Sequence, residues 1–404
     1  MSAVISTVSN LLKDVYLPPV VEQLSNEVEL LNRIKKKSDA ELVGNQVVLP
    51  LHTNRSGGIG SRAESEALPT AGNQGFQRAV FDLSYHYGRI QVSGPAMAKT
   101  KSNIGSFLDV LKLEMDGIKN DLKKDLARQV WGASDGNTGG NGRIAQCGTT
   151  TADNDIVLAS DEPLRKGHLY VGMRVDVGTA ADPDSLIAGE VITAISVASK
   201  TITVTTAVTT SSSHFVSRAG NAGNELNGLQ TIIPTAANSV GGIDASTAGN
   251  EFWDVHRDNV AGALVIDDMQ QMWNTLRVAG TTPDLLLTTP GIQRSYYNLL
   301  QDQIRYVEPM KIKAGYDKEA LAFNNKPLVE DVDARFGQIY FLTTDHILNL
   351  TNEDWHWLDE DGDVLKWVTG FDAWEAALAS YFQVGTDRRN LFGLMYGITD
   401  ATGV

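Results

Sequence analysis

The sequence is poor in cysteine, in basic charge and in long apolar runs. Cys147 is the only cysteine among 404 residues, so an internal disulfide is impossible and a reducing compartment is favoured. The formal net charge of −15 argues against tight, sequence-independent DNA binding. No apolar run approaches the roughly 18–20 residues needed to span a bilayer, and the N-terminus lacks the pattern of a secretory signal. No membrane partner is expected.

Motifs that carry common enzyme chemistry are missing as well. The sequence has no G-x-x-x-x-G-K-[ST] phosphate loop, no G-x-G-x-x-G after a strand and no H-E-x-x-H. The 7 histidines are scattered. His52 and His86 could face each other across a predicted hairpin, but two histidines alone are a weak basis for a metal site. We therefore predict no catalytic, cofactor-binding or metal-ligating residues, although missing motifs do not exclude an enzyme.

Two predicted strands are separated by an unusually long connection. Residues 45–53 form the first, and residues 77–93 alternate apolar and polar positions and form the second. The segment between them is far too long for a tight turn, and structureless loops of this length are uncommon in compact domains unless they are functional. We therefore expect an extended hairpin whose tip reaches away from the body.

Residues 102–131 have the strongest periodicity in the chain. Apolar residues recur at spacings of three and four, which indicates a helix on the order of 40 Å long. Its opposite face carries charged residues, among them Lys119, Lys123 and Arg128. The helix is therefore expected to pack along a broad surface, and its predicted core residues are Leu111, Met115, Ile118 and Leu122.

The composition changes after this helix. Residues 150–220 contain β-branched runs separated by Gly, Asp, Pro and Ser, which predicts a small all-β domain inserted into a mixed chain. We expect it to lean on its host and yet to be separable, because few contacts usually cross a domain boundary. Residues 228–247, GLQTIIPTAANSVGGIDAST, follow it, and their paired glycines could cradle a phosphate or serve a turn. Helices and strands alternate from 250 to 300, and strands dominate from 327 onward.

This order of segments resembles the major capsid protein of tailed bacteriophages, which has the Hong Kong 97-type fold. The family's extended loop is similar to NQVVLPLHTNRSGG…QRAVFDLSYHYGRIQVS, and its spine helix is similar to residues 102–131. A strand and helix of its axial domain resemble PDLLLTTPGIQRSYYNLL, and its closing strands resemble WEAALASYFQVGTDRRNLFGLMYGI. The implied α+β fold has an arm at 1–44, an extended loop at 45–93, a peripheral domain at 94–149, an inserted β domain at 150–220, a connector at 221–249, an axial domain at 250–349 and closing peripheral strands at 350–404.

The resemblance implies a structural subunit rather than an enzyme, with no cofactor. Copies of the chain would form hexamers and pentamers of an icosahedral head shell in the virion, assembled in the host bacterial cytoplasm around weakly contacted double-stranded DNA. A portal and a decoration protein are implied partners. Only about 44 residues precede the hairpin, so the resemblance implies a separate scaffolding protein, or none. Residues 54–93 contain no lysine, so a covalent crosslink from the loop is not supported. The implied contacts with a neighbouring subunit are Arg55, Arg62, Glu64, Glu66 and Arg78.

Three other interpretations remain open. An encapsulin-like compartment would share the fold and differ in having a cargo gene beside it. A cytosolic α/β enzyme with a β accessory domain is an alternative from another class. A β-rich receptor-binding or tail protein is the third, and the long helix at 102–131 counts against it. The capsid resemblance implies that the glycines of 228–247 supply backbone freedom in a turn and do not form a phosphate site.

Overall fold

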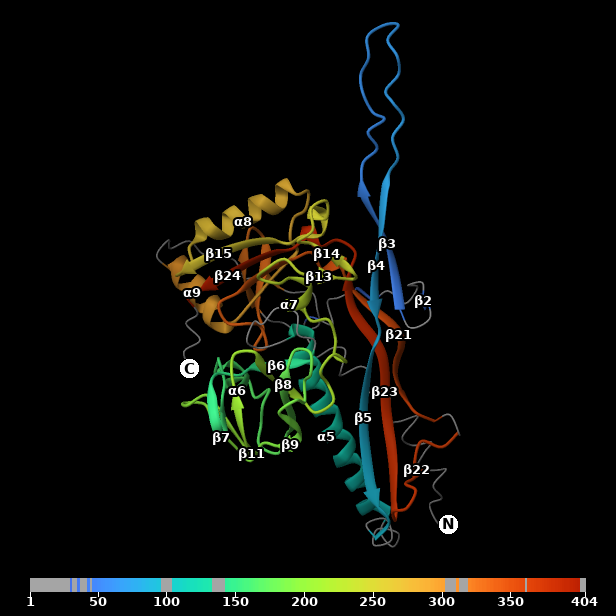
Figure 1. Ribbon diagram of the computed structural model, residues 1–404, viewed down its shortest axis with the longest axis vertical. Coiled ribbons are helices and arrows are strands. Elements are labelled where there is room, and N and C mark those ends of the chain that lie inside the picture. The colour runs from blue at the N-terminus through green and yellow to red at the C-terminus, as the bar shows by residue number, and fades with distance from the viewer. Residues whose placement is uncertain are drawn as a thin grey trace.

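A computed structural model describes most of the chain. The described residues are Leu30 and 35–36, 42–43, 46–95, 104–132, 142–301, 310–311, 319–359 and 362–399. The backbone alone is described for 35–36, 42–43, 104–113, 301, 310–311 and 319–320. The predicted arm at 1–44 lies almost wholly outside the described residues. Figure 1 shows an elongated molecule from which one long hairpin projects.

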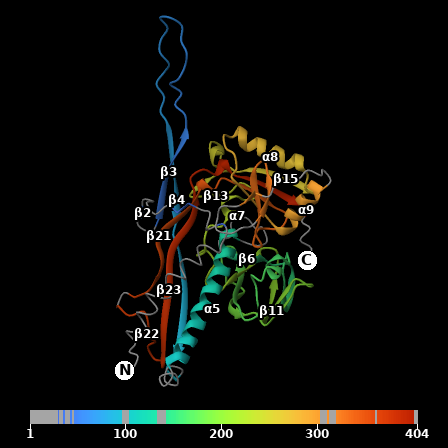
Figure 2. The ribbon, with the colours of Figure 1, turned by 180° about the vertical axis from the view of Figure 1, so that it is seen from behind.

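A long, narrow sheet runs along the molecule beside the helix predicted at 102–131. Its order is β1-β21-β23-β22, and β5 pairs with β23 along its other edge. The helix α5 (Ile104–Trp131) packs against β5, and Figure 2 shows it lying between this sheet and the inserted domain. The strands are β1 (Lys35–Lys36), β5 (Ser84–Ser93), β21 (Ile347–Trp357), β22 (Lys366–Trp367) and β23 (Ala373–Thr386).

The projecting hairpin consists of β3 (Gln46–Asn54) and β4 (Gly75–Asp82), with β2 (Leu42–Val43) beside β3. The single strand predicted at 77–93 is wrong. Leu83 and Ser84 are both buried, so the alternation shifts by one residue there, and β5 leaves the hairpin to pair with β23. A shift of one residue exchanges the two faces of a strand. His86 therefore points inward, while Tyr85 and Tyr87 are exposed.

The inserted domain has two sheets and a hydrophobic core of its own. One sheet has the order β6-β12-β8-β9 and the other β10-β11-β7. The helix α6 (Glu162–Arg165) packs beside them. The domain already begins at 143, before the predicted start at 150, because β6 pairs with β12. Its strands are β6 (Arg143–Gln146), β7 (Thr150–Val157), β8 (Arg174–Thr179), β9 (Ile187–Val191), β10 (Ala194–Ser196), β11 (Thr201–Thr210) and β12 (His214–Arg218).

A seven-stranded sheet with order β15-β24-β20-β16-β19-β18-β17 forms the third part. The segment NLFGLMYGI was predicted to close the peripheral sheet, but it forms β24, which pairs with β15 and β20. Two helices accompany this sheet, α8 (Ile266–Val278) and α9 (Pro290–Gln301). The strands are β15 (His256–Gly262), β16 (Leu285–Thr288), β17 (Met310–Lys311), β18 (Glu319–Phe323), β19 (Lys326–Glu330), β20 (Ile339–Leu342) and β24 (Gly393–Ile398).

The segment 228–247 links the inserted domain to this sheet. It contains the short helix α7 (Leu229–Ile232) and a small hairpin of β13 (Ser239–Val240) and β14 (Ile243–Asp244). Gly241 and Gly242 form its two-residue turn with φ of +60° and +77°. Positive φ at both central positions is the type I′ geometry that glycine adopts most easily. The paired glycines therefore serve a turn. In the described part of the chain there are also three 3-10 turns: η2 (Glu251–Trp253), η3 (Thr344–His346) and η4 (Arg389–Leu391).

Candidate assembly surfaces

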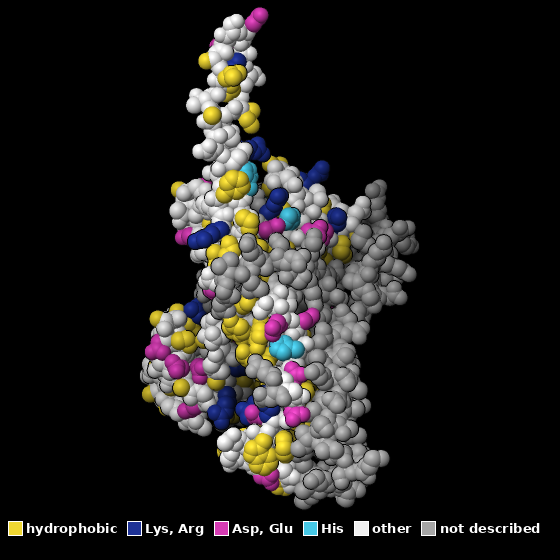
Figure 3. Space-filling view, turned by 90° about the vertical axis from the view of Figure 1, so that its right-hand side faces the viewer, with side chains coloured by type: hydrophobic (Ala, Val, Ile, Leu, Met, Phe, Trp, Pro, Cys, Tyr) yellow, Lys and Arg dark blue, Asp and Glu magenta, His cyan; other side chains and the backbone are white. Residues whose placement is uncertain are grey.

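The outer part of the extended hairpin has no contact that buries it. Val47, Leu49 and Leu51 alternate inward along β3, but no side chain from 52 to 78 is buried. Ile59, Leu68 and Phe76 are 83%, 86% and 70% exposed, and Figure 3 shows hydrophobic side chains along the projecting hairpin. Large exposed apolar side chains on a projecting element are typical of a surface that meets a partner.

The five charged residues predicted for this hairpin are all exposed. Two of them help to shape the tip. The Nε of Arg62 donates to the carbonyl of Ala67 at 3.1 Å, and the Oε2 of Glu66 accepts from the backbone N–H of Ala63 at 3.0 Å. Within the described part of the chain, no ion pair involves any of these five residues, which are Arg55, Arg62, Glu64, Glu66 and Arg78. These charges are thus available to another molecule.

The central face of α5 packs closely on β5. Met115 is 1% exposed, and Ile118 and Leu122 are half-buried against the main core. A Cβ placed on Gly88 of β5 would lie 2.8 Å from the Cδ1 of Leu122 and 3.0 Å from the Cδ1 of Ile118. The helix can approach the strand this closely only because residue 88 is glycine. The side chain of Leu111, predicted for the same core, lies outside the described residues.

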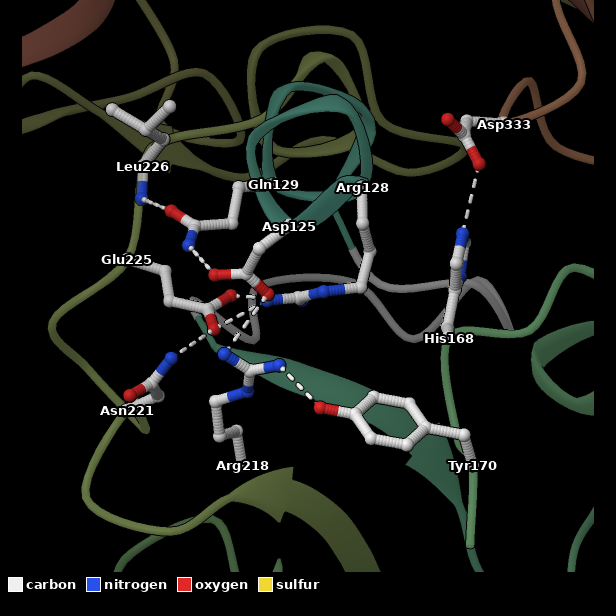
Figure 4. A network of polar contacts seen from close by, with 10 residues as sticks. All are labelled: Asp125, Arg128, Gln129, His168, Tyr170, Arg218, Asn221, Glu225, Leu226 and Asp333. Carbon is white, nitrogen blue, oxygen red and sulfur yellow. Dashed lines mark hydrogen bonds and ion pairs between the residues drawn. The ribbon is translucent and has the colours of Figure 1, made fainter. Parts of the chain in front are cut away.

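A buried polar junction joins the C-terminal half of α5 to the segment that leaves the inserted domain (Figure 4). The guanidinium of Arg128 makes a two-point contact with Glu225, with N–O distances of 2.9 and 2.6 Å. It also donates to Asp125 at 3.1 Å, and Gln129 donates to the same carboxylate at 2.7 Å. Arg128 was predicted on the solvent face of the helix, but it is 2% exposed because these carboxylates compensate its charge.

Burial and neighbouring charges shift the pKa values of this junction in opposite directions. Burial alone would lower the pKa of Arg128, but Glu225 and Asp125 outweigh it and raise that pKa above its usual value. Burial would likewise raise the pKa of Asp125, but Arg128 and Arg218 outweigh it and hold that pKa below its usual value. Arg128 and Asp125 are therefore both ionised at neutral pH.

The inserted domain contacts the loop at 333–334 through α6 and the residues that follow it. Glu162 and Lys166 form a buried ion pair of 2.7 Å, and the Nζ of Lys166 also donates to the carbonyls of Asp333 and Ala334 at 3.1 and 2.6 Å. The ring of His168 lies 2.9 Å from the carboxylate of Asp333. These contacts cross the domain boundary and attach the inserted domain to the rest of the chain. Its separability stays a prediction.

Two further groups, Asp331 and His86, have shifted pKa values. Burial, with help from Asp333, raises the pKa of Asp331 to about 6, and the indole N–H of Trp131 donates to this carboxyl at 3.0 Å. On β5, burial lowers the pKa of His86 to about 4. The ring of His86 lies against Phe382 and not against His52, which contacts Phe76 and Gln74 instead. The predicted pairing of the two histidines is thus wrong.

A second exposed surface lies on the sheet face that α5 does not cover. Tyr85 and Tyr87 of β5 meet Tyr381 of β23 with ring centroids 5.3 and 6.2 Å apart, and His356 of β21 meets the same ring at 5.5 Å. Tyr87 is 57% exposed. The exposure of Tyr85 and Tyr87 was not predicted from the sequence. The usable signal was Gly88, since a glycine in a strand often marks a close approach of another element.

The described residues contain nothing typical of an active site. No group of three or more His, Cys, Asp or Glu side chains among them could hold a metal ion. No described helix is both long enough and apolar enough to cross a membrane. Two shallow depressions lie beside β15 and along α8, lined mainly by uncharged side chains and backbone. The charged clusters of the molecule instead hold its parts together.

Comparison with known proteins identifies the fold. No protein-family model and no curated protein matches the sequence. Among solved structures, the cyanophage A-1(L) capsid asymmetric unit is similar with a TM-score of 0.53 at 13% identity, over 95% of this chain and 93% of that chain. The capsid of a native GTA particle matches at a TM-score of 0.49 and 9% identity, over 92% and 91% of the two chains. The SrpI encapsulin of Synechococcus elongatus PCC 7942 matches at 0.29 and 12% identity, over only 37% and 54%.

At 13% identity the cyanophage match shows a shared fold. The α+β capsid fold predicted from the order of segments is therefore confirmed. The match extends over nearly the whole of both chains.

Proposed function

We propose that this chain is the structural major capsid protein of a tailed bacteriophage, a non-enzymatic subunit that self-assembles into an icosahedral head shell around double-stranded DNA. The observation that carries the proposal is the extended hairpin. A chain with the fold of a capsid chain also holds out a segment, 52–78, in which no side chain is buried. Such a segment gains its stabilisation from other copies of the chain.

The physical basis is repetition. In a closed shell each subunit offers the same hairpin and receives that of another copy, so a heterologous contact is satisfied everywhere. Ion pairs of the exposed hairpin charges are worth only about 0–1 kcal/mol each. Many such contacts acting together still give a stable shell, because linked weak contacts multiply in effect. We place the proposed contacts with the neighbour at Arg55, Arg62, Glu64, Glu66 and Arg78.

The finer parts of the proposal concern organisation and partners. Hexamers and pentamers would build the shell, with assembly in the host bacterial cytoplasm and a separate scaffolding protein, a portal and a decoration protein as partners. The net charge of −15 favours weak and non-specific contact with the enclosed DNA, because a strongly basic lining would hold DNA tightly. An encapsulin-like shell is the alternative within the same fold, and a cargo gene beside this one would favour it.

Replacement of the hairpin tip tests the proposal. Deletion of 56–74 removes no buried residue, so the subunit is expected to keep its unfolding midpoint and to lose shell formation in electron micrographs. A milder variant carries Ile59→Ser, Leu68→Ser and Phe76→Ser, and its matched control is Val278→Ser on α8, which is 90% exposed. The control should assemble normally. Normal shells from the deletion variant would refute the assignment of the hairpin to an intersubunit contact.

A further inference from the structure

The turn between β13 and β14 touches the base of the extended hairpin. The backbone N–H of Val80 in β4 donates to the carbonyl of Gly241 at 2.9 Å. A Cβ placed on Gly241 would lie 3.0 Å from the Cβ of Ala79 and 3.2 Å from the Cζ of Phe81. The two backbones are thus in direct contact, and a glycine is needed for it.

A small hydrophobic cluster surrounds this contact. Trp253, 1% exposed, donates its indole N–H to the carbonyl of Val240 at 2.9 Å. The side chain of Gln77 donates to Asn250 at 3.3 Å, at the outer margin of the cluster. Beyond this point the hairpin is exposed. The buried members are Val47, Leu49, Leu51, Ala79, Phe81, Leu83, Val240, Ile243, Trp253, Leu348 and Leu350.

A buried arginine ties the same turn to the seven-stranded sheet. Arg389 is fully buried, just before β24. Its Nε donates to the carbonyl of Ile232 at 2.9 Å, and its terminal nitrogens donate to the carbonyl and side-chain oxygens of Asn238 at 3.4 and 2.7 Å. Asn238 directly precedes β13. Burial lowers the pKa of Arg389 to about 10, so the guanidinium stays charged at neutral pH and keeps its hold on these oxygens.

We propose that the β13–β14 turn is a clip that fixes the direction in which the extended hairpin leaves the body, and that Arg389 is a positioning residue that anchors this clip to the seven-stranded sheet. The proposal deepens the proposed function, on which it rests, because the direction of the hairpin matters only if its tip must meet a neighbouring subunit.

Two attachments are needed to hold a projecting hairpin. An isolated two-stranded hairpin is at best marginally stable in water. Continuation of β4 into β5 gives one attachment, at Leu83, about which the hairpin could still pivot. The clip adds a backbone attachment at Val80 and, together with the Gln77–Asn250 contact and the buried cluster, restricts this pivoting. A small error at the base becomes a large displacement at the tip, so loss of the clip should spoil assembly without unfolding the subunit.

Two adjacent glycines provide a matched test. Gly241 and Gly242 both have positive φ, so alanine strains the turn at either position. Only at Gly241 would the added Cβ meet the hairpin, because a Cβ at Gly242 has no neighbour within 4 Å. Hydrogen exchange of the unassembled subunit is the readout. We expect Gly241→Ala to speed exchange of the Val80 amide by about tenfold or more, and Gly242→Ala to leave it unchanged. Equal effects of the two variants, or no effect of Gly241→Ala, would overturn the clip.

Arg389 is tested by Arg389→Met against Arg388→Met, whose side chain is exposed. Arg389→Met should speed hydrogen exchange in both β13–β14 and β4, and Arg388→Met should change exchange in neither. Faster exchange in β13–β14 with unchanged exchange in β4 would refute the anchoring role of Arg389. If Arg389→Met fails to fold, the glycine pair still decides the clip. Electron microscopy then separates the two proposals. Misshapen or absent particles from Gly241→Ala, with normal ones from Gly242→Ala, support the clip. If the unaltered chain forms no particles even when it is expressed together with the genes beside it, the proposed function is contradicted and the exchange result still stands.

Discussion

Arg128 and Glu225 lie nearly 100 residues apart in sequence and make a two-point ion pair in which both side chains are at most 5% exposed. The pair joins α5 to the segment that follows the inserted domain. Buried pairs cost desolvation energy and are held by exact compensation of charge. Removal of one partner therefore leaves the other charge buried and unpaired, which destabilises the subunit.

Arg128→Met is expected to destabilise the subunit by about 3–5 kcal/mol, since it leaves Glu225 buried and unpaired. The double variant Arg128→Met, Glu225→Leu should be more stable than the single one because no buried charge is left over from the pair. Denaturant unfolding of the subunit measures both. Lys124→Met, one turn earlier and exposed, is the control and should change stability by less than about 0.5 kcal/mol. A double variant less stable than Arg128→Met would contradict this view of the junction.

Gly88 and Gly117 should respond oppositely to alanine. At Gly88 the new Cβ would meet Leu122 and Ile118, so overpacking should cost about 1–3 kcal/mol. At Gly117, exposed on α5 with nothing within 4 Å of a new Cβ, alanine should stabilise by about 0.4–1 kcal/mol. Leu122→Ala should relieve the clash, so that the Gly88→Ala, Leu122→Ala double variant loses less than the sum of the singles. Additive losses would show that helix and strand are not in contact there.

His86 should make the subunit acid-sensitive. Its pKa falls from 6.5 to about 4 on folding because burial disfavours the charged ring, so the unfolded chain binds the proton more readily. Stability is then fully present above about pH 6.5 and declines as the pH falls toward 4, by about 3 kcal/mol for this group alone. Burial lowers the pKa of His168 too, with the same sign. Denaturant unfolding at pH 7.5 and 5 should show a smaller loss for His86→Leu than for the unaltered chain, and equal losses would exclude His86 as the cause.

The inserted domain should depend on Lys166 for its attachment. Lys166→Met leaves Glu162 buried without its cation and frees two carbonyls of the 333–334 loop, so we expect a loss of about 3–5 kcal/mol. The neighbouring Arg165→Met removes a more exposed pair with Asp161 and should cost less than about 1 kcal/mol. Thermal unfolding followed with limited proteolysis would show the inserted domain loosening first. Equal losses in the two variants would mean that the 333–334 loop does not hold the domain.

Much of the fold could be predicted from local patterns. The period of 3.6 between Met115 and Leu122 predicts α5, and turn residues between β-branched runs predict the inserted domain. The change of strand partner at Leu83 could not be predicted from sequence. Tyr85 and Tyr87 continue the apolar alternation there, while the inward face of the strand shifts by one residue. Apolar alternation predicts a strand but not which sheet it joins, so β24 was assigned to the wrong one.

The residues that hold the assembly surfaces in place were the least predictable. Arg128 and Arg389 look like solvent-facing charges in sequence, and only contacts with Glu225 and with the carbonyls near Asn238 account for their burial. These partners lie about 100 and 150 residues away along the chain. By contrast, the projecting hairpin was expected from sequence, because the unusual length of the connection marked the segment. The role of its charged residues in contacts between subunits stays a prediction.

The central claim is that this chain builds a closed shell, and electron microscopy of particles from cells that express it tests the claim most directly. The chain should be expressed alone and together with the genes beside it, so that a scaffolding protein is supplied if one is needed. We predict hollow, closed particles of uniform size, far larger than any small oligomer of a 43.7 kDa subunit. Single subunits or one small, discrete oligomer under both conditions would contradict the account.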